Sequence, residues 1–93
     1  MDKALEKFSR EVIITNELGV HARSAAKIVA LAKDAKSIVW IIKDGEKADA
    51  SGILDILTLE CTKGSKIIVE ITDPSDLDIL NAIAELVEKR FEE

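Results

Sequence analysis

The segment "SIVWIIKDGEK", residues 37–47, restricts the fold more than any other part of the chain. Its first half, Ser37–Lys43, is rich in β-branched and aromatic residues, which is typical of a strand. Asp44 and Gly45 follow at once, and this dipeptide beside a strand is a strong signal for a tight hairpin turn. The chain should therefore return as a second strand, which favours an antiparallel sheet.

The flanking segments predict two more strands and three helices. The strands are Glu11–Thr15 and the apolar run of "KGSKIIVEIT". The helices run from Ala22 to about Ala35, over "ILDILTLE", and over a last segment that ends near Phe91. Ser75, after Pro74, is the predicted N-cap of that last helix. The order β-α-β-β-α-β-α predicts an α+β domain in which helices cover one face of a four-stranded antiparallel sheet.

Composition restricts the class of protein. The 93 residues suffice for one domain, and with 3% aromatic residues the core must consist of Ile, Leu, Val and Ala. A net charge of -5 argues against a nucleic-acid partner. No apolar run approaches the roughly 20 residues of a membrane span. The charged start is unlike a signal peptide, so we expect a cytoplasmic protein without membrane insertion. One Cys and one His give no disulfide and no metal-site spacing, and no cofactor is expected.

The only histidine, His21, stands in "NELGVHARSAAK", between Gly19 and a predicted helix. By position alone, it is equally well explained as a polar residue without a further role. The start of a helix, however, has unpaired N–H groups and a positive dipole end, which favour an anion. Imidazole is a nucleophile at neutral pH, and the Arg23 guanidinium suits phosphate oxygens. This set suits a transient phosphohistidine, and no second base is near to activate water for hydrolysis.

The segment from Asn16 to Lys33 resembles the active site of the HPr family, the histidine-containing phosphocarrier proteins of the sugar phosphotransferase system. The family motif Gly-Leu-His-Ala-Arg-Pro-Ala stands here as "GVHARSA", and the layout matches from Glu11 to Phe91. The resemblance implies an open-faced sandwich with sheet order 1-4-2-3 and three helices on one face. It places the HPr-like domain at residues 11–93, after an N-terminal extension at residues 1–10.

The same resemblance implies roles in sugar transport. His21 would accept a phosphoryl group on Nδ1 from phosphorylated enzyme I and pass it to a downstream sugar permease or regulatory protein. The chain would thus be a carrier and not a stand-alone enzyme. Arg23 would stabilise the phosphate, and Ser24, where the family usually has proline, is a candidate phosphate contact. The regulatory serine of Gram-positive members falls on Gly52, which leaves Ser51 as the local candidate for regulation and as the predicted N-cap of the short helix.

The surface that docks enzyme I would join the second helix to the histidine region. Its members here are Lys27, Ile53, Leu54 and Leu57. Asp55 and Glu60 add negative charge, which should weaken docking to the acidic surface of a generic enzyme I. These charges and the missing serine favour the alternative, an HPr-like binding module that docks a regulator or metabolic enzyme. A small hydrolase of the acylphosphatase type would need a glycine-rich phosphate loop, which the chain lacks. Cys61 is expected to be an apolar filler.

Alternation along the strands separates two faces of the sheet. By the resemblance, the helices should cover Val12, Ile14, Val39, Ile41, Ile67, Val69 and Ile71. The opposite face would carry Ile13, Ile38, Trp40, Ile42 and Ile68. A bare apolar surface of this kind favours association, so a weak homodimer through the Trp40 face is one expectation. The other is a short N-terminal helix over this face, in the same chain or across a dimer, in which Met1, Leu5 and Phe8 share one side. The alternative to this helix is a frayed terminus.

Overall fold

The structure, a computed structural model, describes residues 8–93. Its elements are β1 (Ser9–Ile13), α2 (Ala22–Ala32), β2 (Val39–Lys43), β3 (Glu46–Asp49), α3 (Ile53–Thr58), β4 (Lys66–Ile71) and α4 (Leu77–Glu88), with single 3-10 turns η1 (Pro74–Asp76) and η2 (Arg90–Glu92). The predicted order β-α-β-β-α-β-α is confirmed. No helix within residues 8–93 combines the length and the apolar character that crossing a membrane requires.

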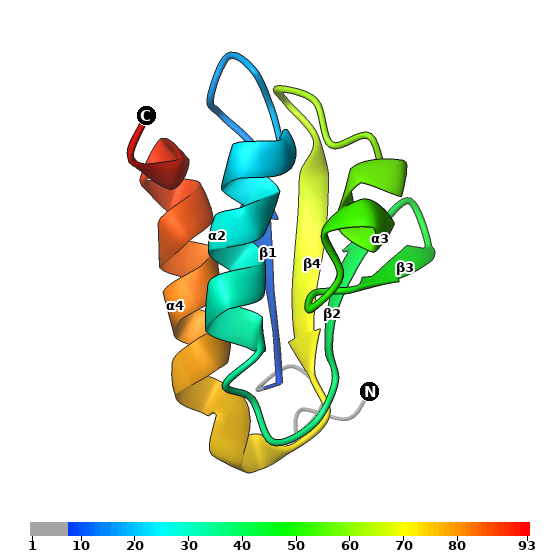
Figure 1. Ribbon diagram of the computed structural model, residues 1–93, viewed down its shortest axis with the longest axis vertical. Coiled ribbons are helices and arrows are strands. Elements are labelled where there is room, and N and C mark those ends of the chain that lie inside the picture. The colour runs from blue at the N-terminus through cyan, green and yellow to red at the C-terminus, as the bar shows by residue number, and fades with distance from the viewer. Residues whose placement is uncertain (1–7) are drawn as a thin grey trace.

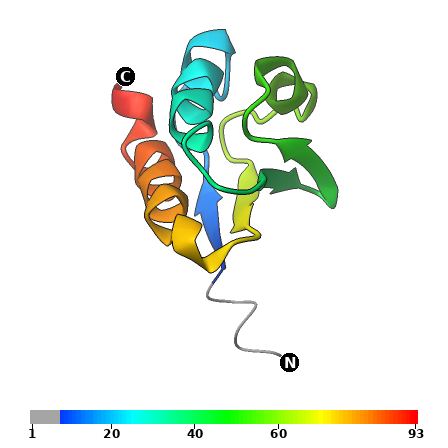
Figure 2. The same cartoon turned by 60° about the horizontal axis from the view of Figure 1, so that its bottom comes forward.

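The four strands form one antiparallel sheet in the order β1-β4-β2-β3, as the resemblance implied. The hairpin between β2 and β3 turns at Asp44 and Gly45, whose φ angles of 52° and 82° are both positive, as a two-residue type I′ turn requires. Helices α2, α3 and α4 lie on one side of the sheet (Figure 1), and in the turned view none of the helices within residues 8–93 lies on its other side (Figure 2). The predicted α+β sandwich is therefore confirmed.

Strand alternation places the core between the sheet and the helices. All seven side chains that were expected to face the helices are buried, at 4% exposure or less. The helices meet them with apolar residues at helical spacing, among them Ala25, Ile28, Ile56, Leu80, Ile83 and Val87. Burying an aliphatic side chain of this size contributes about 1.5–3 kcal/mol. This layer therefore fixes α2, and with it the residues at its N-terminus, against the sheet.

The other face of the sheet is only partly apolar. Ile13 and Ile38 are 50% and 46% exposed. Trp40 is half-buried, and the Lys47 ammonium lies 5.3 Å from its ring centre and 3.8 Å from Glu70. A cation over an aromatic ring is attracted to it and covers it. The face is therefore partly screened by the chain's own polar side chains, and a homodimer through it stays a prediction.

The proposed N-terminal helix falls mostly on residues 1–7, which lie outside the described residues. Phe8, its third member, packs against the core cluster on the helix side of the sheet, and its C=O accepts a 2.8 Å hydrogen bond from Ile71. The expectation that Phe8 covers the Trp40 face is wrong. The strand also starts early: β1 begins at Ser9, and Ser9 and Arg10, which were assigned to the extension, already pair with β4.

Two predicted caps are wrong, for the same reason. The η1 turn that leads into α4 is capped by Asp73, whose Oδ1 accepts hydrogen bonds from the N–H and the hydroxyl of Ser75, and α4 itself has Asp76 as its N-cap without a side-chain bond. In the same way, Ser51 donates its N–H and hydroxyl to Asp49, and Gly52 is the N-cap of α3 without a side-chain bond. In each case the N–H and the hydroxyl of the serine donate to the carboxylate of an aspartate two residues earlier, which is common in such turns.

The last helix is shorter than predicted. α4 ends at Glu88, and η2 follows, so that Phe91 enters the core with φ at 56° and no exposed surface. Its helical spacing with Val87 was a correct signal for burial, but a wrong signal for continued helix. The left-handed conformation of residues 90–92 turns the chain toward the N-terminal end of α2.

Candidate functional site

His21 is the N-cap of α2. Its backbone is extended, with φ at -120°, and its Nδ1 accepts a 3.3 Å hydrogen bond from the N–H of Arg23. The imidazole therefore lies at the start of the helix, where N–H groups lack partners and the dipole end is positive. The side chain is 29% exposed, so the ring is partly accessible from solvent.

Ser24 completes a capping box with His21. Its Oγ accepts a hydrogen bond from the His21 N–H at 2.9 Å and donates one to the His21 C=O at 3.1 Å. Ser24 has no exposed surface. The hydroxyl thus serves the cap and holds the backbone on both sides of His21. A phosphate contact by Ser24 stays a prediction, and it would require these bonds to rearrange.

The loop before His21 is held by backbone contacts. Gly19 has φ at +65°, and a Cβ built on it would lie 2.5 Å from the C=O of Cys61. Only glycine fits both this conformation and this approach. The next residue, Val20, donates its N–H to the same carbonyl at 2.8 Å. The crossing of two backbones therefore fixes where His21 leaves the loop.

A segment distant in sequence completes the site. The Nε2 of His21 lies 2.6 Å from Oε2 of Glu93, and the other carboxylate oxygen accepts a hydrogen bond from Nδ2 of Asn16 at 3.1 Å. Asn16 also donates to the C=O of Gly19 at 2.8 Å, and its own Oδ1 has no partner among the described residues. The hydrogen bond from His21, aided by Asn16 and the charge of Lys27, holds the pKa of the Glu93 carboxyl below its usual value.

The fold brings Glu93 back to the histidine through η2. Arg90, Phe91 and Glu92 all have φ between 56° and 60°, which costs roughly 1–2 kcal/mol per residue outside glycine. Two contacts offset this cost: Phe91 is fully buried, and the ammonium of Lys27 donates a 2.6 Å hydrogen bond to its C=O. Strained backbone held by surrounding contacts is common at functional sites.

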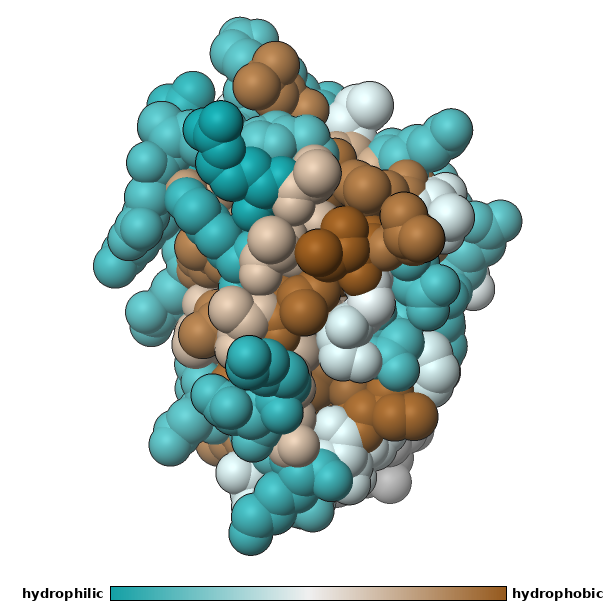
Figure 3. Space-filling view, in the orientation of Figure 1, coloured by the Kyte–Doolittle hydropathy of each residue, from teal (hydrophilic) through white to brown (hydrophobic). Residues whose placement is uncertain are grey.

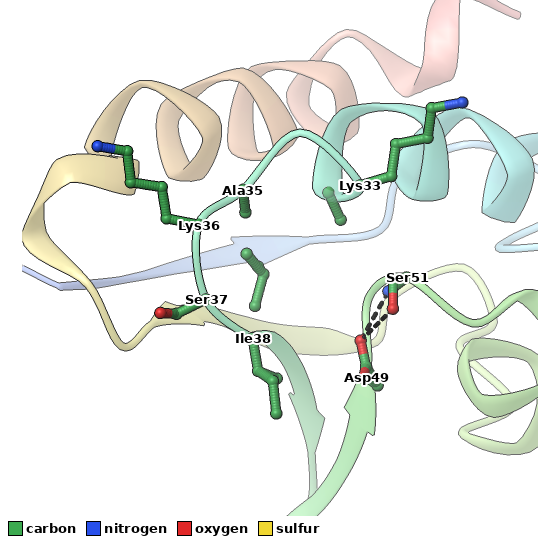
Figure 4. Close-up of a pocket in the computed structure, with 9 residues that line it drawn as sticks. Lys33, Ala35, Lys36, Ser37, Ile38, Asp49 and Ser51 are labelled. Atoms are coloured by element: carbon green, nitrogen blue, oxygen red, sulfur yellow. Dashed lines mark hydrogen bonds between the residues drawn. The ribbon is translucent and has the colours of Figure 1, made fainter.

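The structure brings together only some of the residues that the sequence singled out. Arg23 is exposed on the first turn of α2, beside His21 and Ser24. Ser51 lies elsewhere, next to a pocket of about 300 Å³ that also includes Ala32 and Lys33, at the opposite end of α2 (Figure 4). This pocket does not touch His21.

Three of the four candidate docking residues, Ile53, Leu54 and Leu57, lie on α3, which packs against α2. Leu54 is 77% exposed, Ile53 is 37% exposed, and Leu57 packs partly against the core. In the space-filling view, hydrophobic side chains gather over the seam between α2 and α3 (Figure 3). Lys27 lies on α2, but its ammonium is engaged with Phe91. Docking at this surface stays a prediction for all four residues.

Sequence reasoning missed Asn16 and Glu93. Asn16 opens the quoted histidine segment, so its position could have drawn attention. Glu93 gives no local signal, because 72 residues separate it from His21. Cys61 was correctly expected to be buried, at 3% exposure, and this burial raises the pKa of its thiol, which suits a packing role. Within residues 8–93, no three His, Cys, Asp or Glu side chains are grouped to hold a metal ion.

The geometry defines what the site can do. Nε2 faces a carboxylate and Nδ1 faces the N–H groups of the first helical turn. An electrophile that carries negative charge would meet favourable dipoles at Nδ1. The guanidinium of Arg23, two residues after His21, adds a positive charge on the same helical turn. The arrangement therefore suits covalent attachment of an anionic group to one ring nitrogen.

Comparison with known proteins identifies the family. The family model PTS-HPr, described as "PTS HPr component phosphorylation site", matches residues 8–89. The chain is 38% identical to the phosphocarrier protein NPr of Shewanella violacea, over 96% of this chain and 98% of that protein. It is 33% identical to the phosphocarrier protein HPr of Cupriavidus necator, over 90% and 94%. A crystal structure of HPr-C-His from Thermoanaerobacter tengcongensis superposes with a TM-score of 0.82 at 31% identity, over 91% and 96%. The chain therefore belongs to the HPr family of phosphocarrier proteins.

Proposed function

We propose that this chain carries a phosphoryl group on Nδ1 of His21, which it accepts from phosphorylated enzyme I and passes to a downstream protein of the phosphotransferase system. The observation that supports this most directly is the placement of Nδ1 at the N-terminus of α2, 3.3 Å from the N–H of Arg23. That position combines a nucleophilic nitrogen with a site suited to an anion.

The transfer needs no other reactant. The lone pair of Nδ1 attacks phosphorus on the donor, the new N–P bond forms, and the bond to the donor breaks with its electron pair left on the donor. The proton on Nε2 stays in place, so the ring becomes positively charged. The reverse sequence delivers the phosphoryl group to the next protein. The chain itself is regenerated and acts as a carrier.

The bound group would lie among donors. Forming the Nδ1–P bond removes the acceptor of the Arg23 N–H, which can then donate to a phosphoryl oxygen, as can the N–H of Ala22. The exposed guanidinium of Arg23 supplies a positive charge with two or more donors. Both interactions become strong only when the phosphoryl group reaches Nδ1. They therefore stabilise the transferred group and not the unmodified histidine, which favours the transfer.

The exposed apolar seam of α2 and α3 is the proposed docking surface. Leu54 and Ile53 protrude from α3, close to the helix that begins at His21. A donor seated on this surface would bring its phosphoryl group to the start of α2. Asp55 in α3 and Glu60 just after it are exposed, and their charges would favour a dedicated partner with complementary positive charge over a generic enzyme I.

A regulatory binding module is the second candidate. It is favoured by one observation, the 77% exposure of Leu54 beside an acidic side chain, because a surface of this kind can dock a protein without any phosphoryl transfer. The two candidates differ in a measurable way: only the carrier gains a covalent group on His21.

The test is incubation with phosphoenolpyruvate and the enzyme I of the same source, followed by intact-mass measurement. We expect one acid-labile phosphoryl group on the wild-type chain and none on His21→Ala. Arg23→Ala should slow the transfer by more than about tenfold with an unchanged melting temperature, since the guanidinium is exposed. Lys36→Ala, which removes an exposed charge distant from His21, is the matched control and should transfer normally. No mass gain on the wild-type chain would leave the binding module as the function.

A further inference from the structure

The contact between His21 and Glu93 determines which ring nitrogen carries the proton. A carboxylate can only accept hydrogen bonds, so the 2.6 Å contact at Nε2 requires the proton on Nε2. On the other side of the ring, the N–H of Arg23 donates to Nδ1, which requires a lone pair there. The two contacts demand the same tautomer, and they leave Nδ1 as the nucleophilic atom.

The carboxylate is held in place from several directions. Asn16 donates to its second oxygen at 3.1 Å and is itself fixed by its bond to Gly19. Phe91 anchors the segment two residues earlier, with Lys27 on its carbonyl. The side chain of Glu93 is 23% exposed, so water competes only in part for the contact. Because the carboxylate of Glu93 is already held in position, no free energy is needed to position it when the reaction occurs.

The reaction itself gives the carboxylate a further effect. When Nδ1 bonds to phosphorus, the neutral ring becomes a cation with its proton on Nε2. The negative charge of Glu93 then lies 2.6 Å from the atom that carries the proton. A carboxylate beside the distal nitrogen of a catalytic histidine is a known way to orient the ring and to stabilise the imidazolium. The same physical reasoning applies to an imidazole that acts as the nucleophile.

We propose that Glu93 is a positioning residue for phosphoryl acceptance, which holds the proton of His21 on Nε2, presents Nδ1 as the nucleophile, and stabilises the positive charge that the ring gains. This inference rests on the proposed carrier function and adds a residue to it. Asn16 and the Phe91 anchor act through Glu93, by keeping its carboxylate against the ring. The lowered pKa of the Glu93 carboxyl is consistent with a group that stays ionised near neutral pH.

The test compares Glu93→Gln with Glu92→Gln. Both variants remove one negative charge from adjacent positions, and Glu92 is exposed. We expect Glu93→Gln to accept phosphoryl groups from excess phosphorylated enzyme I about three- to tenfold more slowly than the wild type, and Glu92→Gln to be unchanged. Glu93→Asp, which keeps the charge on a shorter side chain, should recover part of the rate. Equal melting temperatures of the variants establish that the domain remains folded.

A second readout uses the free protein. Ring ¹⁵N chemical shifts of neutral His21 should show the proton on Nε2 in the wild type and in Glu92→Gln. In Glu93→Gln the proton on Nε2 should exchange faster with solvent. A wild-type ring protonated on Nδ1 overturns the inference, and so does a Glu93→Gln variant that accepts at the wild-type rate or faster. A wild-type chain that accepts nothing overturns the proposed function itself. The two failures are therefore distinguishable.

Discussion

Replacing Ser24 tests how the helix that carries His21 begins. The structure gives the Ser24 hydroxyl two bonds to the His21 backbone, at 2.9 Å and 3.1 Å, within a fully buried side chain. Ser24→Ala removes both bonds. The His21 C=O keeps its bond from the Ala25 N–H at 2.8 Å, whereas the His21 N–H loses the partner that it has in the structure. The loss of a capping side chain of this kind costs about 0.5–2 kcal/mol, so we expect Ser24→Ala to be destabilised by about 1 kcal/mol.

Ser24→Pro loses the same two hydrogen bonds, but the proline ring recovers part of the lost stability. The N–H at this third helical position has no intrahelical acceptor, so a proline removes no helix bond there. Proline at a compatible position also restricts the unfolded chain and contributes about 0.4–1 kcal/mol. Ser24→Pro should therefore be less stable than the wild type by at most about 1 kcal/mol, and more stable than Ser24→Ala by about 0.4–1 kcal/mol.

The assay is urea unfolding followed by the fluorescence of Trp40, the only tryptophan, with thermal melts in parallel. In a domain of this size, 1 kcal/mol corresponds to about 4–8 °C in Tm. An unchanged stability of Ser24→Ala would show that the capping box does not hold the helix start. If Ser24→Pro proved less stable than Ser24→Ala, the backbone at this position would be incompatible with proline, and the reasoning on the helix start would be refuted.

Two further predictions concern the loop before His21 and the response to acid. Gly19→Ala should lower stability by about 2 kcal/mol or more in urea unfolding, because its Cβ would lie 2.5 Å from the C=O of Cys61 at a positive φ; a loss under about 0.5 kcal/mol would contradict this. The N–H and hydroxyl of Ser75 hold the pKa of the Asp73 carboxyl below its ordinary value of 3.8. Since its folded pKa is the lower one, the ionised carboxylate adds stability above pH 3.8 that is lost as the pH falls through the folded pKa. The difference in Tm between wild type and Asp73→Asn should accordingly narrow below that pH, and a constant difference would count against the capping bond.

Local sequence patterns predicted the sheet and its helices well. The hairpin at Asp44 and Gly45 could be read from the sequence, because two successive positive φ angles strongly favour this dipeptide. Alternation in the strands identified the buried face, since neighbouring side chains of a strand point to opposite sides. The same reasoning failed at helix caps. Ser51 and Ser75 are good caps by residue type, but an aspartate two residues earlier competes for each of them.

The sequence identified His21, Arg23 and Ser24 as candidate site residues because they lie on one helical turn. Within a single turn, the spacing of residues in the sequence determines their distance in space. Local sequence patterns thus predict the fold class, the start of α2 and His21 as the proposed phosphoryl acceptor. The rest of the candidate site depends on tertiary contacts. The left-handed turn after α4 carries Glu93 to Nε2 of His21, across 72 residues of chain, and no local pattern encodes such a contact. It arises from the burial of Phe91 and the crossing of Gly19 over Cys61, which depend on the packed sheet and helices.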